Sequence, residues 1–276
     1  MIQIVCIKWG TKYGNDPVNR MYRAIIRQTR SAARFVCVTD NPAAGFDEGV
    51  VVVPLPAFDV AREVLYGGCR LKLAIFADGV LQDGLPTIYV DLDTMIRGDV
   101  ARLAAEVERH PDSMFMLQNH FVPWWRVRPL VQPVLGERYY FGNSSLLGFY
   151  PERFHFIFDD FNRRMRAPRD PLPKYLKSDE RFISYAARAH VRVFPRRLAV
   201  KFAEEYMAPV AAMEEVRKRL PWVLARRHSV VAITFVGLDF KPAKLAALKK
   251  GQIVHYRHLS HRWDHDDFRD YWLGSV

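Results

Sequence analysis

The apolar positions in the first 118 residues repeat with two different periods. Short runs rich in β-branched residues, typical of buried strands, occur at QIVCI, RFVCVT, VVVVPL and TIYVDLD. Five apolar side chains between the first two runs recur at helical spacing: Val18, Met21, Tyr22, Ile25 and Ile26. Because Asp16 and Pro17 form a favourable helix start, we predict a helix over about 17–30. This alternation of strands and helices indicates an α/β fold.

The fourth run ends in two carboxylates, Asp91 and Asp93, which directly follow its apolar residues. Asp99 can then cap a helix with the pattern VARLAAEVE, and SMFMLQ predicts another strand. Ligands of open α/β sheets bind outside the carboxyl ends of the strands. The position of the two carboxylates therefore favours a binding role.

The chain beyond residue 119 is less regular at first. The stretch FVPWWRVRPLVQPVLGERYYFGNSSLLGFYP is rich in aromatic residues, proline and glycine, and predicts loops and a strand pair over a site. Helical patterns return in PERFHFIFDDFNRRM and SDERFISYAARA, and SVVAITFVG and KPAKLAALKK predict a late strand and helix. Since no repeat or linker requires a domain boundary, we expect a single domain over 1–276.

Composition narrows the class of protein, its location and the kind of partner that it can bind. Half of the residues are hydrophobic, no apolar run reaches the roughly 18 residues of a membrane-spanning helix, and the N-terminus does not resemble a signal peptide. We therefore expect a globular, cytoplasmic protein. Cys6, Cys37 and Cys69 form no metal or disulfide pattern and are interpreted as buried thiols. The net charge of +11 indicates a polyanionic partner: nucleic acid, an anionic membrane surface or a phosphorylated substrate.

Candidate chemistry begins with Asp91 and Asp93. They can offer oxygen ligands to Mg²⁺ or Mn²⁺, ions that usually keep open positions for water and substrate phosphates. A lone Asp-x-Asp is more often a solvated turn. The strand before it and the helix after it favour the metal-binding interpretation.

Two basic segments are candidate phosphate or base contacts. The first is the loop after the first strand, with Lys8, Trp9, Gly10, Thr11, Lys12 and Tyr13. The second is GGCRLKLAIFADG, which places Arg70 and Lys72 at the start of an apolar-periodic helix. An ordinary glycine turn and an exposed basic pair are the respective alternatives.

Polar groups near later elements are candidates for sugar contacts. Asn143, in GNSSLLGF, precedes a buried strand, and Asp179 and Glu180 lie in the first turn of a predicted helix, where stabilisation of the helix dipole is the alternative role. The histidines of HYRHLSHRWDHDD match no zinc motif, so a solvated basic tail is favoured over a metal site. Trp124 and Trp125 suit packing or sugar stacking.

In order along the chain, these segments resemble a GT-A-fold glycosyltransferase of the glycogenin and bacterial lipopolysaccharide galactosyltransferase group. The matching segments, which cover most of the chain, are IVCIKWGTKYG, VTDN, RLKLAIF, YVDLD, NSSLLGF, SDERF and FVGLDFKP. The resemblance implies a GT-A (Rossmann-like) mixed, mainly parallel sheet flanked by helices. It also implies a nucleotide-binding part at about 1–118 and an acceptor-side part at about 119–276.

The resemblance implies that a sugar moves from a nucleotide sugar, most often a UDP-sugar, to a saccharide or lipid-linked acceptor, usually with retention of configuration. A divalent cation, Mn²⁺ or Mg²⁺, would bridge Asp91, Asp93 and the diphosphate. Lys241 would contact the diphosphate, with Lys72 or Arg70 near it. Asn143 and Asp179 would line the donor-sugar and acceptor pocket.

The chain departs from the family pattern at two places. Thr234 and Val236 stand where the family commonly has a histidine as third metal ligand, so His255 is the candidate replacement. Glu180 stands where the family usually has glutamine and is, with Asp179, the candidate general base if the reaction inverts configuration.

Two other functions remain open at this stage. One is a polyanion-binding module, although no nucleic-acid motif is present and a nucleic-acid partner is not expected. The other is a protein that binds a nucleotide sugar without turning it over, which the missing histidine would explain. The basic charge also suits a peripheral contact with the anionic inner membrane face.

Overall fold

The structure is a computed structural model, and it describes residues 1–11, 13–42, 45–118, 130, 133–134, 142–166, 171–235, 237 and 240–274. Lys12, Trp124, Trp125 and Val236 lie outside the described residues, as does most of the predicted loop region after residue 119. No helix in the described ranges is long and apolar enough to cross a membrane.

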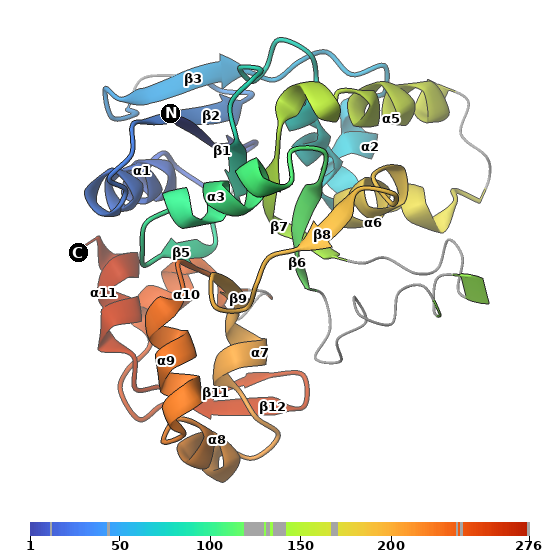
Figure 1. Cartoon of the computed structure of the whole chain (residues 1–276). Helices are drawn as coiled ribbons and strands as arrows, with labels where there is room; N and C mark the ends of the chain where they lie inside the picture. The colour runs from blue at the N-terminus through green and yellow to red at the C-terminus, as the bar shows by residue number, and fades with distance from the viewer. Residues whose placement is uncertain are drawn as a thin grey trace.

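A seven-stranded mixed sheet with the order β3-β2-β1-β4-β7-β6-β8 forms the centre of the molecule (Figure 1). Its strands are β1 (Ile2–Lys8), β2 (Ala33–Thr39), β3 (Val50–Pro54), β4 (Thr87–Val90), β6 (Met114–Gln118), β7 (Gly142–Phe149) and β8 (Val191–Val193). Strands β3, β2, β1 and β4 pair in parallel, whereas β7 runs antiparallel to both β4 and β6. The predicted mixed, mainly parallel sheet is confirmed.

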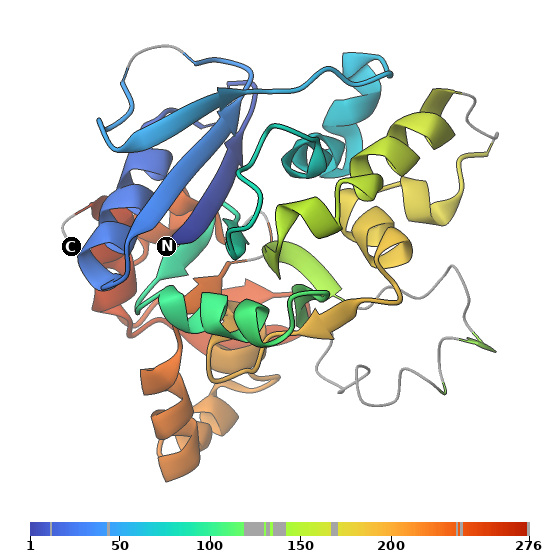
Figure 2. The ribbon, with the colours of Figure 1, turned by 45° about the horizontal axis from the view of Figure 1, so that its top comes forward.

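Two cores lie on opposite faces of this sheet, because successive side chains of a strand point to opposite sides. One face, which includes Ile4 and Cys6 of β1, packs against α1 (Asp16–Gln28) and α3 (Ala101–Arg109). The other face, which includes Val5 and Ile7, packs against the 3-10 segment η1 (Gly67–Phe76) and the helices α5 (Phe156–Arg166) and α6 (Asp179–Ala186). Figures 1 and 2 show the helices on both sides of the sheet.

The later part of the chain builds a smaller region beside the sheet, drawn in orange and red in Figure 1. Its strands are β9 (Ala199–Lys201), β10 (Ala232–Thr234) and the hairpin pair β11 (Ile253–Tyr256) and β12 (Leu259–Arg262). The earlier strand β5 (Thr94–Ile96) joins this region by pairing antiparallel with β10. Its helices are α7 (Phe202–Tyr206), α8 (Ala211–Arg217), α9 (Pro221–Ser229), α10 (Pro242–Ala247) and α11 (Asp266–Leu273). Short elements complete the chain: α2 (Arg62–Tyr66), η3 (Pro151–Arg153) and η4 (Lys174–Leu176).

Most predicted elements are confirmed with small shifts in their bounds. The helix expected over 17–30 is α1, and Asp99 accepts a hydrogen bond from the backbone N–H of Ala101 at 2.9 Å, at the start of α3. The strand predicted through Asp93 ends at Val90, so both carboxylates lie in the turn after it.

Three predictions were wrong. The helix predicted at GGCRLKLAIF is a 3-10 segment, because Gly68 and Cys69 adopt positive φ values of 63° and 57°. Cys69 is exposed, whereas Cys6 and Cys37 are buried as expected. The histidine-containing C-terminal stretch is no solvated tail, since His261 is 3% exposed and Trp263 is completely buried.

Candidate functional site

A pocket lies where the parallel strands β1 and β4 end at the same edge of the sheet. It is lined by Ile7, Lys8, Trp9, Tyr13, Cys69, Lys72, Asp91, Leu92, Asp93 and Lys241. Seven of these ten were predicted as site residues, and they come from four separate segments of the sequence. A larger hollow lies beside α5, where Asp59 and Asp160 form ion pairs with Arg166 and Arg163.

The turn after β4 fixes the position of Asp91. Its backbone N–H donates to the carbonyl of Ser145 at 2.9 Å, and its own carbonyl accepts from the N–H of Thr94 at 2.9 Å. The hydroxyl of Tyr89 donates to the Asp91 carboxylate. Since Tyr89 and Asp91 are two residues apart at the end of a strand, both side chains project toward the same face.

Lys72 is a buried cation of the site, with only 4% of its surface exposed. Its ammonium group lies 2.8 Å from Oδ2 of Asp179 and 3.2 Å from Oδ1 of Asp91, and it donates to Oγ of Ser144 at 3.1 Å. Burial lowers the pKa of Lys72, but the two carboxylates outweigh burial and raise it above its ordinary value. Lys72 therefore stays charged and holds both acids in place.

The segment η1 delivers Lys72 to this position. Gly68 approaches the carbonyl of Lys177 so closely that a Cβ would lie 2.1 Å from that oxygen, and its φ of 63° suits glycine. Arg70 donates to the carbonyls of Leu176 at 2.8 Å and Lys177 at 3.3 Å. The structure thus gives Arg70 a different role from the predicted phosphate contact. It ties η1 to the residues before α6, and it does not line the pocket.

Asp93 pairs with Lys241, which lies at the N-terminus of α10 and forms an ion pair and a hydrogen bond with the carboxylate. Burial, followed by the charge of Asp91, raises the pKa of Asp93, while Lys241 opposes the shift. Burial lowers the pKa of Lys241, but the charge of Asp93 raises it further, so the pKa of Lys241 is raised overall. The ion pair joins the turn after β4 to the late Lys-Pro segment.

The acceptor-side candidates form a second polar group beside Lys72. Oγ of Ser144 donates to Oδ2 of Asp179 at 2.6 Å, and Nδ2 of Asn143 donates to Oε2 of Glu180 at 2.9 Å. Burial, then the charge of Asp179, raises the pKa of Glu180. Asn143, Asp179 and Glu180 thus lie together through direct contacts, and Lys72 connects them to Asp91.

Other predicted residues lie further from this centre. Gly10 and Thr11 are exposed, and the N–H of Gly10 donates to both carboxylate oxygens of Asp40, at 3.2 and 3.1 Å. His255 is exposed on β11. Within the described part of the chain, the ligand atoms of His255, Asp91 and Asp93 do not all lie within 4.8 Å of one another, so they do not form a ready site for one shared ion.

The donor atoms at Asp91 and Asp93 fit a hard cation such as Mg²⁺ or Mn²⁺. Their carboxylates are near enough for the charge of Asp91 to raise the pKa of Asp93, and a cation between them would relieve that repulsion. Thr234, one of the two candidate positions for the family histidine, is 1% exposed, and its hydroxyl lies 3.0 Å from that of Thr94. Asp91 and Asp93 themselves therefore offer oxygen atoms as ligands.

Sequence reasoning missed Tyr89 and the pocket-lining residues Cys69, Ile7 and Leu92. A signal for Tyr89 was present, because period-two alternation puts it on the same side of the chain as Asp91. No comparable signal points to Cys69, whose place depends on the positive φ values in η1.

The sequence matches no protein-family model and no curated protein. The structure, however, is similar to solved glycosyltransferases. The galactosyltransferase LgtC, solved in complex with donor and acceptor sugar analogs, aligns with a TM-score of 0.56 at 14% identity over 100% of this chain and 96% of that one. The bifunctional glycosyltransferase WbbM aligns with a TM-score of 0.56 at 13% identity over 98% of this chain and 49% of its own.

GlyE of Streptococcus pneumoniae, another glycosyltransferase, aligns with a TM-score of 0.58 at 10% identity over 99% of this chain and 60% of that one. The chain thus spans nearly all of LgtC but only part of WbbM and GlyE. The fold is the one that these glycosyltransferase structures share, as the resemblance to GT-A-fold enzymes implied.

Proposed function

We propose that this chain is a glycosyltransferase that moves a sugar from a nucleotide sugar, with UDP as the expected nucleotide, to a saccharide or lipid-linked acceptor. The observation that carries the proposal is the convergence of Lys72, Asp91, Asp93 and Lys241 in one pocket at the carboxyl ends of β1 and β4. This is the edge where ligands of open α/β sheets bind. The shared fold of LgtC, WbbM and GlyE supports it.

The two carboxylates and two ammonium groups suit a diphosphate. Asp91 and Asp93 would hold a Mn²⁺ or Mg²⁺ ion, which when bound supplies positive charge to the phosphate oxygens. Lys241 is half-buried and raised in pKa, so it presents a permanent charge to a diphosphate in the pocket. Lys72, fixed between Asp91 and Asp179, orients the carboxylates.

Asp179 and Glu180 are the proposed acceptor-side residues. The raised pKa of Glu180 would suit a general base in an inverting reaction, which is the alternative to the retention proposed below. Asn143 holds Glu180 through its amide, and Ser144 holds Asp179 through its hydroxyl. We propose retention of configuration, with the acceptor hydroxyl on the same face as the leaving diphosphate. An NMR assignment of the product anomer tests that part.

The decisive experiment is calorimetric titration of the protein with UDP, GDP and CMP, each with and without Mn²⁺. Binding of UDP that depends on Mn²⁺ is expected for the wild type, and Asp91→Asn and Asp93→Asn should each lose at least tenfold in affinity. Glu48→Gln, which changes an exposed acid, is the matched control and should bind as the wild type does. Metal-dependent binding that survives unchanged in both aspartate variants would refute the site.

A second candidate is a protein that binds the nucleotide sugar without turnover. Thr234 favours it, because this residue replaces the family histidine and its hydroxyl contacts Thr94 in the interior. The two functions differ in one observable. Slow release of UDP from a UDP-sugar, by transfer or hydrolysis, supports the transferase, whereas a bound donor that is never consumed supports the binding protein. Salt-sensitive binding of oligonucleotides without binding of UDP would instead indicate a polyanion-binding module.

A further inference from the structure

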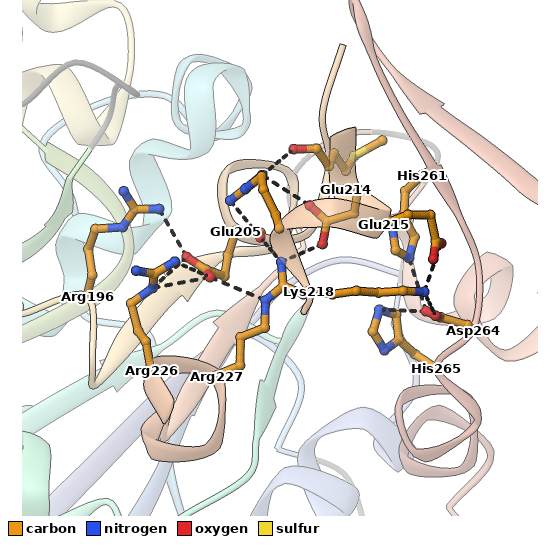
Figure 3. Close-up of polar contacts among 12 residues, drawn as sticks. Arg196, Glu205, Glu214, Glu215, Lys218, Arg226, Arg227, His261, Asp264 and His265 are labelled. Carbon is orange, nitrogen blue, oxygen red and sulfur yellow. Dashed lines mark hydrogen bonds and ion pairs between the residues drawn. The ribbon is translucent and has the colours of Figure 1, made fainter. Parts of the chain in front are cut away.

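We propose that His261, Asp264 and His265 form a Zn²⁺ site, separate from the proposed sugar-transfer pocket. The three residues lie at the end of β12 and in the link to α11, spaced three and one residues apart. One ligand atom from each lies within 4.8 Å of the others. Figure 3 shows both imidazoles next to the Asp264 carboxylate.

The distances within this group match those between the ligands of a tetrahedral zinc ion. Nε2 of His261 lies 3.6 Å from Oδ1 of Asp264, and Nε2 of His265 lies 3.3 Å from the same oxygen. With zinc–ligand bonds of about 2.0–2.1 Å, neighbouring ligands of a tetrahedral ion are roughly 3.3 Å apart. Each imidazole therefore lies at about this spacing from the Asp264 carboxylate.

The burial of His261 is a second, independent observation. This side chain is 97% buried, at 3% exposure, and neither of its ring nitrogens makes a hydrogen bond of regular geometry within the described residues. Nε2 of His265 also has none. Buried polar atoms without partners are rare and costly, and a metal ion would satisfy both Nε2 atoms at once. The carbonyl of Tyr206 faces the His261 ring, as expected for the outer contact that orients a metal-binding imidazole.

Burial is the largest cause that lowers the pKa of both His261 and His265, so it favours the neutral imidazole, the form that binds a metal. Their rings are nearly parallel, at 9° with centroids 5.1 Å apart. One ring must rotate about its Cβ–Cγ bond to aim both lone pairs at one ion, which is a soft torsion for histidine.

The surrounding cations do not exclude an ion, because each has a carboxylate partner of its own. The cations that face the group are Arg97, Arg227 and Lys218, paired with Asp267, Glu214 and Glu215 respectively. Lys218 also reaches Oδ2 of Asp264 at 2.8 Å, which leaves Oδ1 facing the histidines. Asp264 is 32% exposed, so an ion can enter from its side.

A second histidine-containing group, Asp78, Asp83 and His155, is less suited to this role. Its carboxylates are 88% and 52% exposed and remain well solvated. At the His261 group, by contrast, His265 stacks on Phe268 of α11 with ring centroids 4.4 Å apart. Zinc there would connect β12 to the start of α11 through three protein ligands and would leave a fourth position for water.

The test is zinc binding by the full-length chain after treatment with a chelator. We expect one equivalent of Zn²⁺ that is lost in His261→Gln and His265→Gln and retained in His258→Gln, which changes an exposed histidine of the same stretch. Asp91→Asn should also retain it, which separates this site from the pocket. Four-coordinate Co²⁺ bands in the visible spectrum should follow the same pattern.

Two further readouts distinguish a metal site from a change in folding. Zinc at about a hundredfold above Kd should raise the Tm of the wild type by roughly 5 °C and leave that of His265→Gln unchanged. Lys218→Met, which removes a competing cation from Asp264, should tighten zinc binding several-fold. Equal zinc stoichiometry in the wild type and both folded histidine variants, or a loss caused by His258→Gln alone, would overturn the proposal.

Discussion

Replacement of Lys72 by methionine tests whether the charge of Lys72 stabilises the folded protein through its two carboxylate partners. The ammonium group is the shared partner of Asp91 and Asp179, and the side chain is buried. Methionine fills a similar volume but leaves two carboxylates without their cation. Removal of one partner from a buried ion pair costs about 3–5 kcal/mol of unfolding free energy. Asp91 is 23% exposed and recovers some hydration, so we expect a loss of about 3–4 kcal/mol.

The stability loss of Lys72→Met should also depend on pH, in a direction that follows from the pKa shifts. In the wild type, the raised pKa of Lys72 contributes stability that is fully present below the ordinary value of 10.5, so Lys72 adds no slope between about pH 5 and 8. In the wild type, burial raises the pKa of both Glu180 and Asp93, and the charge of Lys72 opposes the shift, so the loss of that charge in Lys72→Met should raise both pKa values further in the folded state. The folded variant then binds more protons than the unfolded chain, and its stability falls as pH rises.

The assay is urea unfolding followed by circular dichroism at about pH 5 and pH 8. The deficit of Lys72→Met should be larger at the higher pH by about 1–2 kcal/mol, since each unit of pKa shift corresponds to about 1.4 kcal/mol. Addition of Asp179→Asn should recover part of the loss. Lys250→Met, at an exposed position, is the control. A deficit below about 1 kcal/mol, or one of equal size at both pH values, would refute the reasoning.

Two further predictions concern other charged groups. Glu205 is completely buried and accepts hydrogen bonds from Arg196, Arg226 and Arg227 (Figure 3). Glu205→Gln should therefore lower the free energy of unfolding by about 3 kcal/mol. An unchanged midpoint of urea unfolding would contradict this prediction. At the pocket, a metal held by two carboxylates and a diphosphate should bind cooperatively with UDP. UDP should then raise Mn²⁺ affinity by the same factor by which Mn²⁺ raises UDP affinity, and calorimetric titrations in both orders that show independent binding would exclude that arrangement.

The sequence predicts the elements around the pocket well, because their signals are local. The β-branched runs and the apolar spacing after Pro17 specify β1, β2 and α1 without help from distant residues. The predicted residues Lys72, Asp91 and Lys241 do meet in one pocket. Their order along the chain was informative only together with the family resemblance, since each segment alone suits an ordinary turn.

Pairings over long sequence separations account for most of what the sequence did not predict. The partner of Lys72 in α6 is more than a hundred residues away, and its approach depends on the positive φ of Gly68 and on the carbonyls that Arg70 binds. The apolar periodicity of GGCRLKLAIF does not predict the kink that the positive φ values of Gly68 and Cys69 produce. The burial of His261 likewise comes from the packing of a hairpin against α7, which the spacing of histidines cannot reveal.

Thr234 shows how a single replacement changes two parts of the site together. A histidine there would offer a nitrogen ligand, but the short hydroxyl side chain instead meets Thr94 across the β5–β10 pair, in the interior. The same short strands hold the turn of Asp93, because the N–H of Phe235 donates to the Asp93 carbonyl at 3.0 Å. The backbone of Asp93 is therefore held by a hydrogen bond that does not involve the side chain of residue 234. Under the proposed function, two carboxylates alone would leave more of the cation's coordination to the donor diphosphate, so metal and nucleotide should bind as one unit.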